Sequence, residues 1–157
     1  MIILLRGWDG CGKTSLAERI HSTLPNSELF TVSCSSLSPD SNYIHYTACA
    51  DDVRGYLTDR PASYAIVDDC GVRCSNLEPF IAVGSCLNHR VFQDIPSSVF
   101  EVIYLSKASS PNSRQTGKKL LEDHLCRSSH KNCDADVSFD SLWEYASLPI
   151  FNYGYCS

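Results

Sequence analysis

Residues 7–14 of this chain read GWDGCGKT and match the template G-x-x-x-x-G-K-[ST] at every fixed position. Glycines in this template let successive backbone N–H groups turn toward one anion, the lysine reaches the outer phosphates, and the hydroxyl can ligate magnesium. The stretch therefore predicts a site for a nucleoside triphosphate and Mg²⁺. The residues predicted to bind the nucleotide are Gly7, Asp9, Gly10, Cys11, Gly12, Lys13, Thr14 and Ser15.

The sequence on either side of residues 7–14 has the pattern that this template requires, a strand before it and a helix that starts inside it. Residues 2–5 are a short apolar run with β-branched members, which predicts a buried strand. After Lys13, apolar residues recur at helical spacing until Pro25, at Leu16, Ala17, Ile20 and Leu24. The alternative is a glycine-rich turn without a ligand. It is disfavoured because the flanks and the motif agree independently.

Apolar runs and helical patterns alternate along the rest of the chain. Further strands are predicted at residues 28–33, 64–67 and 99–105, of which the last is the strongest, and at 150–151. Helices are predicted at residues 50–59, 76–89 and 140–148, and from Ser110-Pro111 onward, with a loop at 33–42. This alternation indicates one α/β domain over residues 1–157. Its parallel sheet carries helices on both faces, as in the three-layer sandwich of P-loop NTPases.

Composition and charge limit the classes of partner. The net charge is −5 and the sequence pI is about 5.4, so nothing draws the whole chain toward nucleic acid or an anionic membrane. No apolar run approaches the roughly 18 residues of a membrane span. We therefore predict a cytoplasmic protein, in the host cytoplasm if a virus encodes it, whose partners are small-molecule nucleotides. The sequence leaves open whether two copies form a homodimer.

Nine cysteines are an odd number, and no export signal accompanies them, so we expect reduced thiols. One cluster, His124, Cys126, His130 and Cys133, contains four possible zinc ligands. A helix would point His124 and Cys126 to different sides. Ordinary surface or core residues are therefore favoured over a zinc site, which stays open.

Asp68 ends an apolar strand, and ligands of parallel sheets bind at the carboxyl ends of the strands. Its carboxylate would lie beside the loop and could hold Mg²⁺ together with Thr14. The alternative is a structural cap at the strand end. Residues 68–71 also spell D-x-x-G, a switch element of small GTPases, but residues 105–108 do not supply the guanine-reading N-K-x-D. A GTPase is therefore a minor alternative.

Phosphoryl transfer needs cations beyond one lysine, because negative charge spreads over the phosphoryl oxygens in the transition state. Arg114 follows the segment predicted to be the strongest strand, where a mobile lid would close over the donor phosphates. Arg54 and Arg73 flank the Asp68 strand, on the side where a phosphate acceptor would bind. For each arginine the alternative is a solvated surface charge.

These residues resemble the thymidylate kinases. Residues 4–17 are similar to the opening of that family, whose loop reads E-G-x-D-G-x-G-K-[ST]-T, and shortened members are encoded by viruses and phages. Residues 53–57 (VRGYL) resemble its I-R-x-L-L helix, and residues 66–69 with Arg73 and Ser75 resemble its D-R-Y segment. Residues 103–105 with Ser110, Pro111 and Arg114 resemble the strand and lid that follow.

The resemblance implies roles for individual residues. Lys13 would contact the transferred phosphoryl group, Thr14 the magnesium ion, and Asp9 the sugar 3′-hydroxyl of the acceptor. Family members with glycine after that aspartate take a catalytic arginine from the lid, which implies that Arg114 is the second catalytic residue. The residues predicted to bind the acceptor are Asp9, Arg54, Asp69 and Arg73.

The chain departs from the family pattern at three places. Arg6 replaces the glutamate before the loop, and residues 43–48 contain no arginine where the family has R-E-P. Asp69 stands at the position of the D-R-Y arginine, so Arg73 or Arg54 would have to bind the acceptor phosphate instead. Arginine before the first loop glycine also occurs in proteins similar to polynucleotide kinases.

The sequence thus leads to an ATP- and Mg²⁺-dependent kinase that phosphorylates a deoxynucleoside monophosphate, with thymidylate (dTMP to dTDP) as the expected acceptor. Two alternatives stay open. A polynucleotide 5′-kinase would share the loop and Arg6 but should need a more basic groove. A nucleotide-binding regulator without catalysis would share only the loop.

Overall fold

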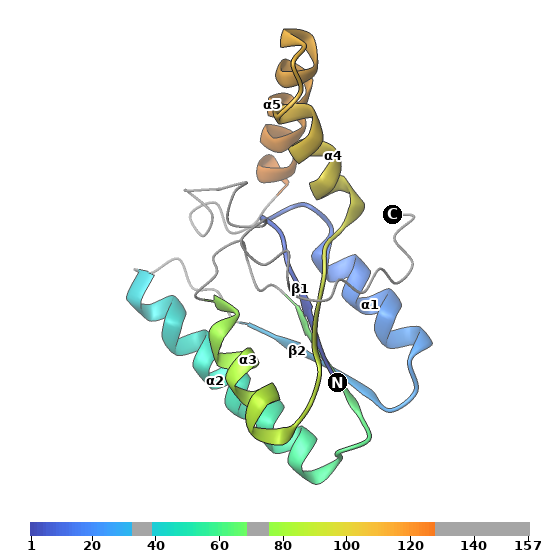
Figure 1. Cartoon of the computed structure of the whole chain (residues 1–157), viewed down its shortest axis with the longest axis vertical. Helices are drawn as coiled ribbons and strands as arrows, with labels where there is room; N and C mark the ends of the chain where they lie inside the picture. Colours follow the sequence, from blue (N-terminus) through green and yellow to red (C-terminus); the bar gives the residue numbers. More distant parts are fainter. Residues whose placement is uncertain (33–38, 69–75, 128–157) are drawn as a thin grey trace.

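The computed structural model describes residues 1–32, 39–68 and 76–127 (Figure 1). These residues form an α/β fold with a four-stranded parallel sheet in the order β2-β3-β1-β4. The strands are β1 (Ile2–Leu5), β2 (Ser27–Thr31), β3 (Tyr64–Asp68) and β4 (Val91–Asp94). The helices are α1 (Lys13–Thr23), α2 (Pro39–Asp59), α3 (Glu78–Leu87), α4 (Ser97–Ser106) and α5 (Pro111–Cys126).

The sheet has a helical layer on each face because side chains of its strands alternate in direction. Ile2 and Leu4 of β1, which pair with Ala65 and Val67 of β3, belong to one apolar cluster with α2 and α3. Ile3, one residue further along β1, belongs to a second cluster with α1 on the opposite face. The fold is therefore the three-layer sandwich that the sequence predicts.

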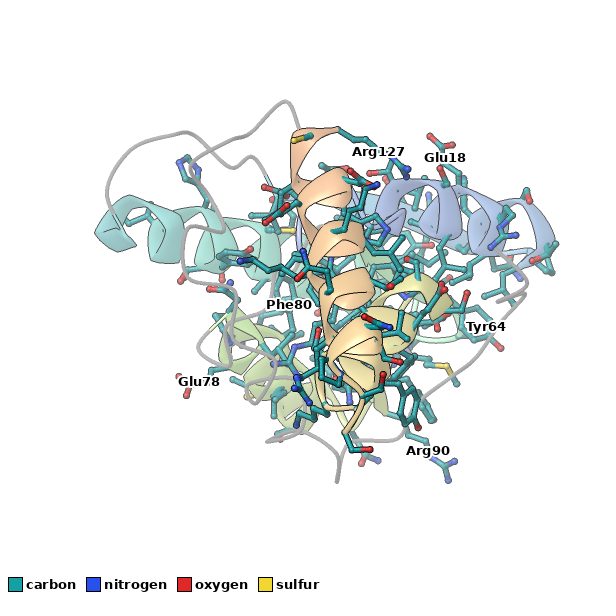
Figure 2. The ribbon with its side chains drawn as sticks, turned by 90° about the horizontal axis from the view of Figure 1, so that it is seen from above. Glu18, Tyr64, Glu78, Phe80, Arg90 and Arg127 are labelled. Atoms are coloured by element: carbon teal, nitrogen blue, oxygen red, sulfur yellow. The ribbon has the colours of Figure 1, made fainter. Side chains whose placement is uncertain are left out.

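The helices cover the sheet through residues at helical spacing. On α2 the buried side chains are Tyr46, Cys49, Ala50, Val53 and Leu57, and on α1 they include Leu16, Ala17 and Ile20. Phe80 of α3 is fully buried, and Figure 2 shows it toward the middle of the molecule while Glu78 of the same helix lies at the rim. No helix in the described residues has the length and apolar character needed to cross a membrane.

Helices α4 and α5 form a hairpin that projects beyond the carboxyl edge of the sheet (Figure 1). The two helices approach closely at Gly117, where a Cβ would lie 2.9 Å from the backbone nitrogen of Ser106. In the part of the chain that the structure describes, the start of α4 and the end of α5 contact the loop that follows β1, through Ser98 and His124. We call this end of the hairpin the hairpin base.

The strand predicted at residues 99–105 is wrong, because this segment is helix α4. Val99, Val102 and Ile103 are buried at the spacing of one helix face, whereas Tyr104 is 69% exposed. An apolar run of seven residues interrupted only by Glu101 fits a buried strand and a buried helix face equally well, so its periodicity does not separate them. Pro96 at the N-cap position of α4 has no backbone N–H to donate within a sheet, so it separates β4 from α4.

One strand and one helix start also differ from the prediction. Strand β4 was not predicted, and α2 begins at Pro39, within the segment predicted as a loop up to residue 42. Proline and aspartate are typical of a first helical turn, which explains the start at Pro39-Asp40. The helix predicted at 140–148 and the strand at 150–151 lie outside the described residues.

Candidate functional site

The loop predicted to bind phosphate, residues 7–14, follows β1 at the carboxyl edge of the sheet and ends in the first two residues of α1. Gly10 and Gly12 have φ values of 77° and 103°, a region that residues with a side chain rarely adopt. A Cβ on Gly12 would meet no described atom within 4 Å, so the loop is open on that side. The sheet, this loop and the following helix together define a P-loop α/β protein.

The first turn of α1 faces this open side. Gly12 is its N-cap, no side chain caps the turn by a hydrogen bond, and no acidic residue lies within it. Thr14 and Ser15 are exposed. The first backbone N–H groups of a helix have no partner within the helix and carry partial positive charge, so this end of α1 is suited to bind phosphate.

Lys13 supplies a cation to the loop. Its Nζ donates a hydrogen bond of 2.6 Å to the carbonyl oxygen of Gly7 and lies 4.0 Å from Oδ1 of Asp9. Lys13 and Asp9 are both largely buried, at 5% and 8% exposure. The ammonium group is thus held over the loop by short contacts and does not extend into solvent.

Thr14 and Asp68 join the loop to the end of β3. The Thr14 hydroxyl donates a hydrogen bond of 2.8 Å to Oδ2 of Asp68, whose side chain is buried. A hydroxyl and a carboxylate are the hard oxygen ligands that Mg²⁺ prefers. Their proximity beside an anion site fits a magnesium ion bound to nucleotide phosphates, with these two residues as its protein ligands.

The back of the loop packs against the hairpin base. Trp8 is fully buried, and its indole Nε1–H donates a hydrogen bond of 3.1 Å to Nδ1 of His124 on α5, with the two rings stacked at 6.2 Å. On α4, the Ser98 hydroxyl donates 2.8 Å to the carbonyl oxygen of Cys11. Ser98 was not predicted to contact the loop, and His124 was predicted to be an ordinary surface or core residue or a zinc ligand, because no pattern marks contacts between residues so far apart in the chain.

The His124 ring must be neutral at Nδ1 to accept this hydrogen bond. Burial lowers its pKa, and the nearby positive charge of Arg127 lowers it further, while Asp123 and Glu101 oppose the shift. Both effects that lower the pKa favour the neutral ring. Arg127 lies at the end of α5, as Figure 2 shows.

Arg6, Gln93 and Asp94 form a buried polar cluster next to the start of the loop. Arg6 is fully buried, its Nη1 donates to Oε1 of Gln93 at 3.4 Å, and its backbone N–H donates to the Asp94 carbonyl at 3.0 Å. Gln93 and Asp94 are fully buried on β4. The guanidinium of Arg6 therefore ties β4 to the residue before the loop and is not presented at the surface.

The structure does not bring Arg114 to the loop. Its exposed guanidinium donates to the carbonyl oxygens of Ala108 and Ser109, at 2.9 and 2.8 Å, near the tip of the hairpin. Ten residues separate it from His124, which corresponds to about 15 Å along α5. The prediction placed Arg114 after a strand ending at the sheet edge, whereas α4 carries the chain away from that edge.

Arg54 also lies away from the loop. It is exposed near the end of α2, two residues before Tyr56, whose hydroxyl is 3.5 Å from the Asn26 carbonyl at the start of β2. This is the opposite edge of the sheet. Asp69 and Arg73, the other predicted acceptor residues, lie outside the described residues.

Four of the nine cysteines, and two of the four possible zinc ligands, lie in the described part of the chain. The four described cysteines, Cys11, Cys49, Cys86 and Cys126, are free thiols. His124 is buried and Cys126 is exposed, so the two side chains lie on different sides of α5. His130 and Cys133 lie outside the described residues.

Cys49 is expected to resist alkylation in the folded protein. Burial raises the pKa of its thiol from 9.0 to about 12, and the charge of Asp52 acts in the same direction. At pH 9 an ordinary thiol is half ionised, whereas only about one in a thousand Cys49 thiols would be. Peptide mass spectrometry after iodoacetate treatment at pH 9 should find exposed Cys86 modified and Cys49 unmodified until urea is added. Equal rates in the folded protein would contradict this.

Comparisons with known proteins assign no family to this chain. No family model and no curated protein matches it. Among solved structures, the crystal structure of APE1195 is similar over 94% of this chain and 93% of that chain, with a TM-score of 0.49 and 14% identity. The tunicamycin resistance protein of Deinococcus radiodurans is similar over 94% of this chain and 92% of that chain, with a TM-score of 0.44 and 17% identity. Likenesses this distant identify no activity.

Proposed function

We propose that this protein is a Mg²⁺-dependent phosphotransferase that uses ATP to phosphorylate a deoxynucleoside monophosphate, with thymidylate as the expected acceptor. One observation carries the proposal most directly. The Thr14 hydroxyl meets the Asp68 carboxylate at 2.8 Å, beside the open first turn of α1 and the Lys13 ammonium group. An anion site, a cation and two oxygen ligands for a metal are therefore assembled at one edge of the sheet.

The donor phosphates would bind to the backbone N–H groups of the loop and of the first turn of α1. Lys13 would exchange its hydrogen bond to the Gly7 carbonyl for phosphate oxygens. Thr14 and Asp68 would hold Mg²⁺, which, when bound, neutralises charge on the donor phosphates. These groups are positioned before the reaction, which is the condition under which charge stabilisation is most effective.

The reaction would be a direct in-line transfer. A phosphate oxygen of the acceptor would attack the γ-phosphorus of ATP, the bond to the β–γ bridging oxygen would break, and ADP would leave, with no covalent enzyme intermediate. Asp9 is proposed to bind the acceptor sugar, and Asp69, Arg73 and Arg54 the rest of the acceptor. Arg54, predicted to bind the acceptor, and Arg114, predicted to be the second catalytic residue, both lie far from the loop, so either role would need a different placement from the one described above.

The test is acceptor-dependent release of ADP. The protein is incubated with ATP and Mg²⁺ together with each nucleoside monophosphate, deoxynucleoside monophosphate or 5′-hydroxyl oligonucleotide. We expect ADP release to rise sharply with thymidylate. ATP hydrolysis that does not depend on any acceptor would contradict a kinase. Transfer only to the oligonucleotide would favour a polynucleotide kinase, and tight ATP binding without transfer would favour a regulator.

Replacing Asp68 by asparagine is expected to weaken Mg²⁺ binding by more than about tenfold, because the site loses its negative charge while its shape is kept. Calorimetry with MgATP and with ATP in EDTA separates the two contributions. The affinity for metal-free ATP should change little. Asp51→Asn, at an exposed position of α2, is the control for loss of one negative charge. An unchanged Mg²⁺ requirement in Asp68→Asn would exclude Asp68 as a metal ligand.

A further inference from the structure

The template leaves residues 8–11 of the loop variable, and three of these four residues face the hairpin base, away from the open side. Trp8 and Cys11 form an apolar cluster with Ile95 and with α4, whose members are Val99, Val102 and Ile103. At Gly10, a Cβ would overlap the backbone carbonyl oxygen of His124. The loop is thus sandwiched between its ligand site in front and the hairpin base behind.

The contact on α5 is specific in geometry. The Trp8 indole has one donor, Nε1–H, which donates to Nδ1 of His124 at 3.1 Å. His124 is 7% exposed, and its ring stacks on the indole with an angle of 28° between the planes. A buried donor deprived of such an acceptor would be costly, so the bond favours this one position of Trp8.

The contact on α4 acts on the loop backbone. The Ser98 hydroxyl lies at the start of α4 and donates to the Cys11 carbonyl at 2.8 Å. Cys11 precedes Gly12, the residue that begins α1. The orientation of the peptide group at the entry to the anion site is therefore connected to α4 through a single hydroxyl.

We propose that the hairpin base positions the phosphate-binding loop for nucleotide, with His124 and Ser98 as positioning residues that act through Trp8 and Cys11. The proposal rests on the proposed function, since it concerns the same loop. It assigns to the variable loop residues a task that the fixed residues do not perform. The loop backbone, Lys13 and Thr14 would bind the phosphates and the metal, and the side chains of Trp8 and Cys11 would hold the loop in the shape that allows this binding.

The test compares variants that remove or keep each contact. His124→Leu removes the acceptor, and His124→Asn keeps an acceptor atom two bonds from Cβ, near the position of Nδ1. Glu122→Leu places the same new side chain on the exposed side of α5 as a control. Ser98→Ala and Ser98→Thr remove and keep the hydroxyl on α4. MgATP affinity is measured by calorimetry, and folding by far-ultraviolet circular dichroism.

A second readout reports the contact itself. The chain has two tryptophans, Trp8 and Trp143, so a Trp143→Phe background leaves one indole N–H signal in an NMR spectrum. A hydrogen-bonded, buried indole N–H exchanges slowly with solvent. We expect slow exchange in the parent and in His124→Asn, and fast exchange in His124→Leu.

We expect His124→Leu to weaken MgATP binding about tenfold and Ser98→Ala about threefold, because each leaves the loop free to leave its binding shape. His124→Asn, Ser98→Thr and Glu122→Leu should stay within about twofold of the parent. If the parent itself binds no MgATP, the proposed function and this inference fall together. If the parent binds and His124→Leu binds equally well despite fast indole exchange, the inference alone is wrong. Should His124→Leu fail to fold, full MgATP affinity in Ser98→Ala would overturn it.

Discussion

Replacement of Lys13 by alanine is expected to lower the rate of phosphoryl transfer by about a hundredfold or more, as loss of one preorganised charge-stabilising group does in other enzymes. The Lys13 ammonium is held over the loop by the Gly7 carbonyl and lies near Asp9, so it is in place before nucleotide binds. Without it, the developing charge on the transferred phosphoryl group would lose the cation that the loop holds in place.

The measurement is ADP release in the presence of thymidylate, with Lys118→Ala on the exposed side of α5 as the charge-matched control. Lys13→Ala also loses its hydrogen bond to Gly7, which should cost about 1 kcal/mol of stability. Urea unfolding therefore has to show that the variant is folded under assay conditions. A turnover within tenfold of the parent would contradict the assigned role of Lys13.

The second large effect is expected from Gly10→Ala, which should destabilise the protein by about 2–5 kcal/mol. Two costs add together there. A residue with a Cβ is strained at a φ of 77° by about 1–2 kcal/mol. The methyl group would also overlap the His124 carbonyl of α5, and forcing an extra carbon into a packed contact costs typically about 1–3 kcal/mol.

Gly12→Ala provides the matched comparison. Its φ of 103° brings backbone strain of the same kind, but its Cβ would meet no described atom within 4 Å. We expect a loss of only about 1–2 kcal/mol for Gly12→Ala. Urea unfolding followed by circular dichroism measures both variants. Equal losses would mean that α5 does not press against the loop at Gly10.

The central part of the fold could be predicted because its signals are local. Within twenty residues, the sequence contains the apolar run of β1, the loop glycines and the apolar stripe from Leu16 to Ile20, and each of these features supports the interpretation of the others. Strand β4 gave no such signal, since Gln93 and Asp94 are polar residues buried at the sheet. Arg6, which follows β1, contributes to their burial, since its guanidinium donates to Gln93 and its backbone N–H to the Asp94 carbonyl.

The candidate site divides in the same way. The open side, with Lys13, Thr14 and Asp68, could be predicted from a motif and from the rule that ligands bind at the carboxyl ends of parallel strands. The contact behind the loop could not be predicted, because it depends on His124, which is 116 residues from Trp8 in sequence and belongs to no motif. Misassigning α4 as a strand had the further effect of placing Arg114 near the phosphates, because a strand would have ended at the sheet edge.

Among the described residues, the hairpin contacts the sheet and α1 side of the protein at its base, through the start of α4 and the end of α5, so it would move as a lever about that base. Helix α5 has 16 residues and is about 24 Å long, so a tilt of about 20° at its foot would displace its far end by about 8 Å. Conversely, a force on the far end of α5 would act most strongly at its foot, on the contact between the indole of Trp8 and the ring of His124. The point about which α5 would tilt is therefore one wall of the proposed nucleotide site.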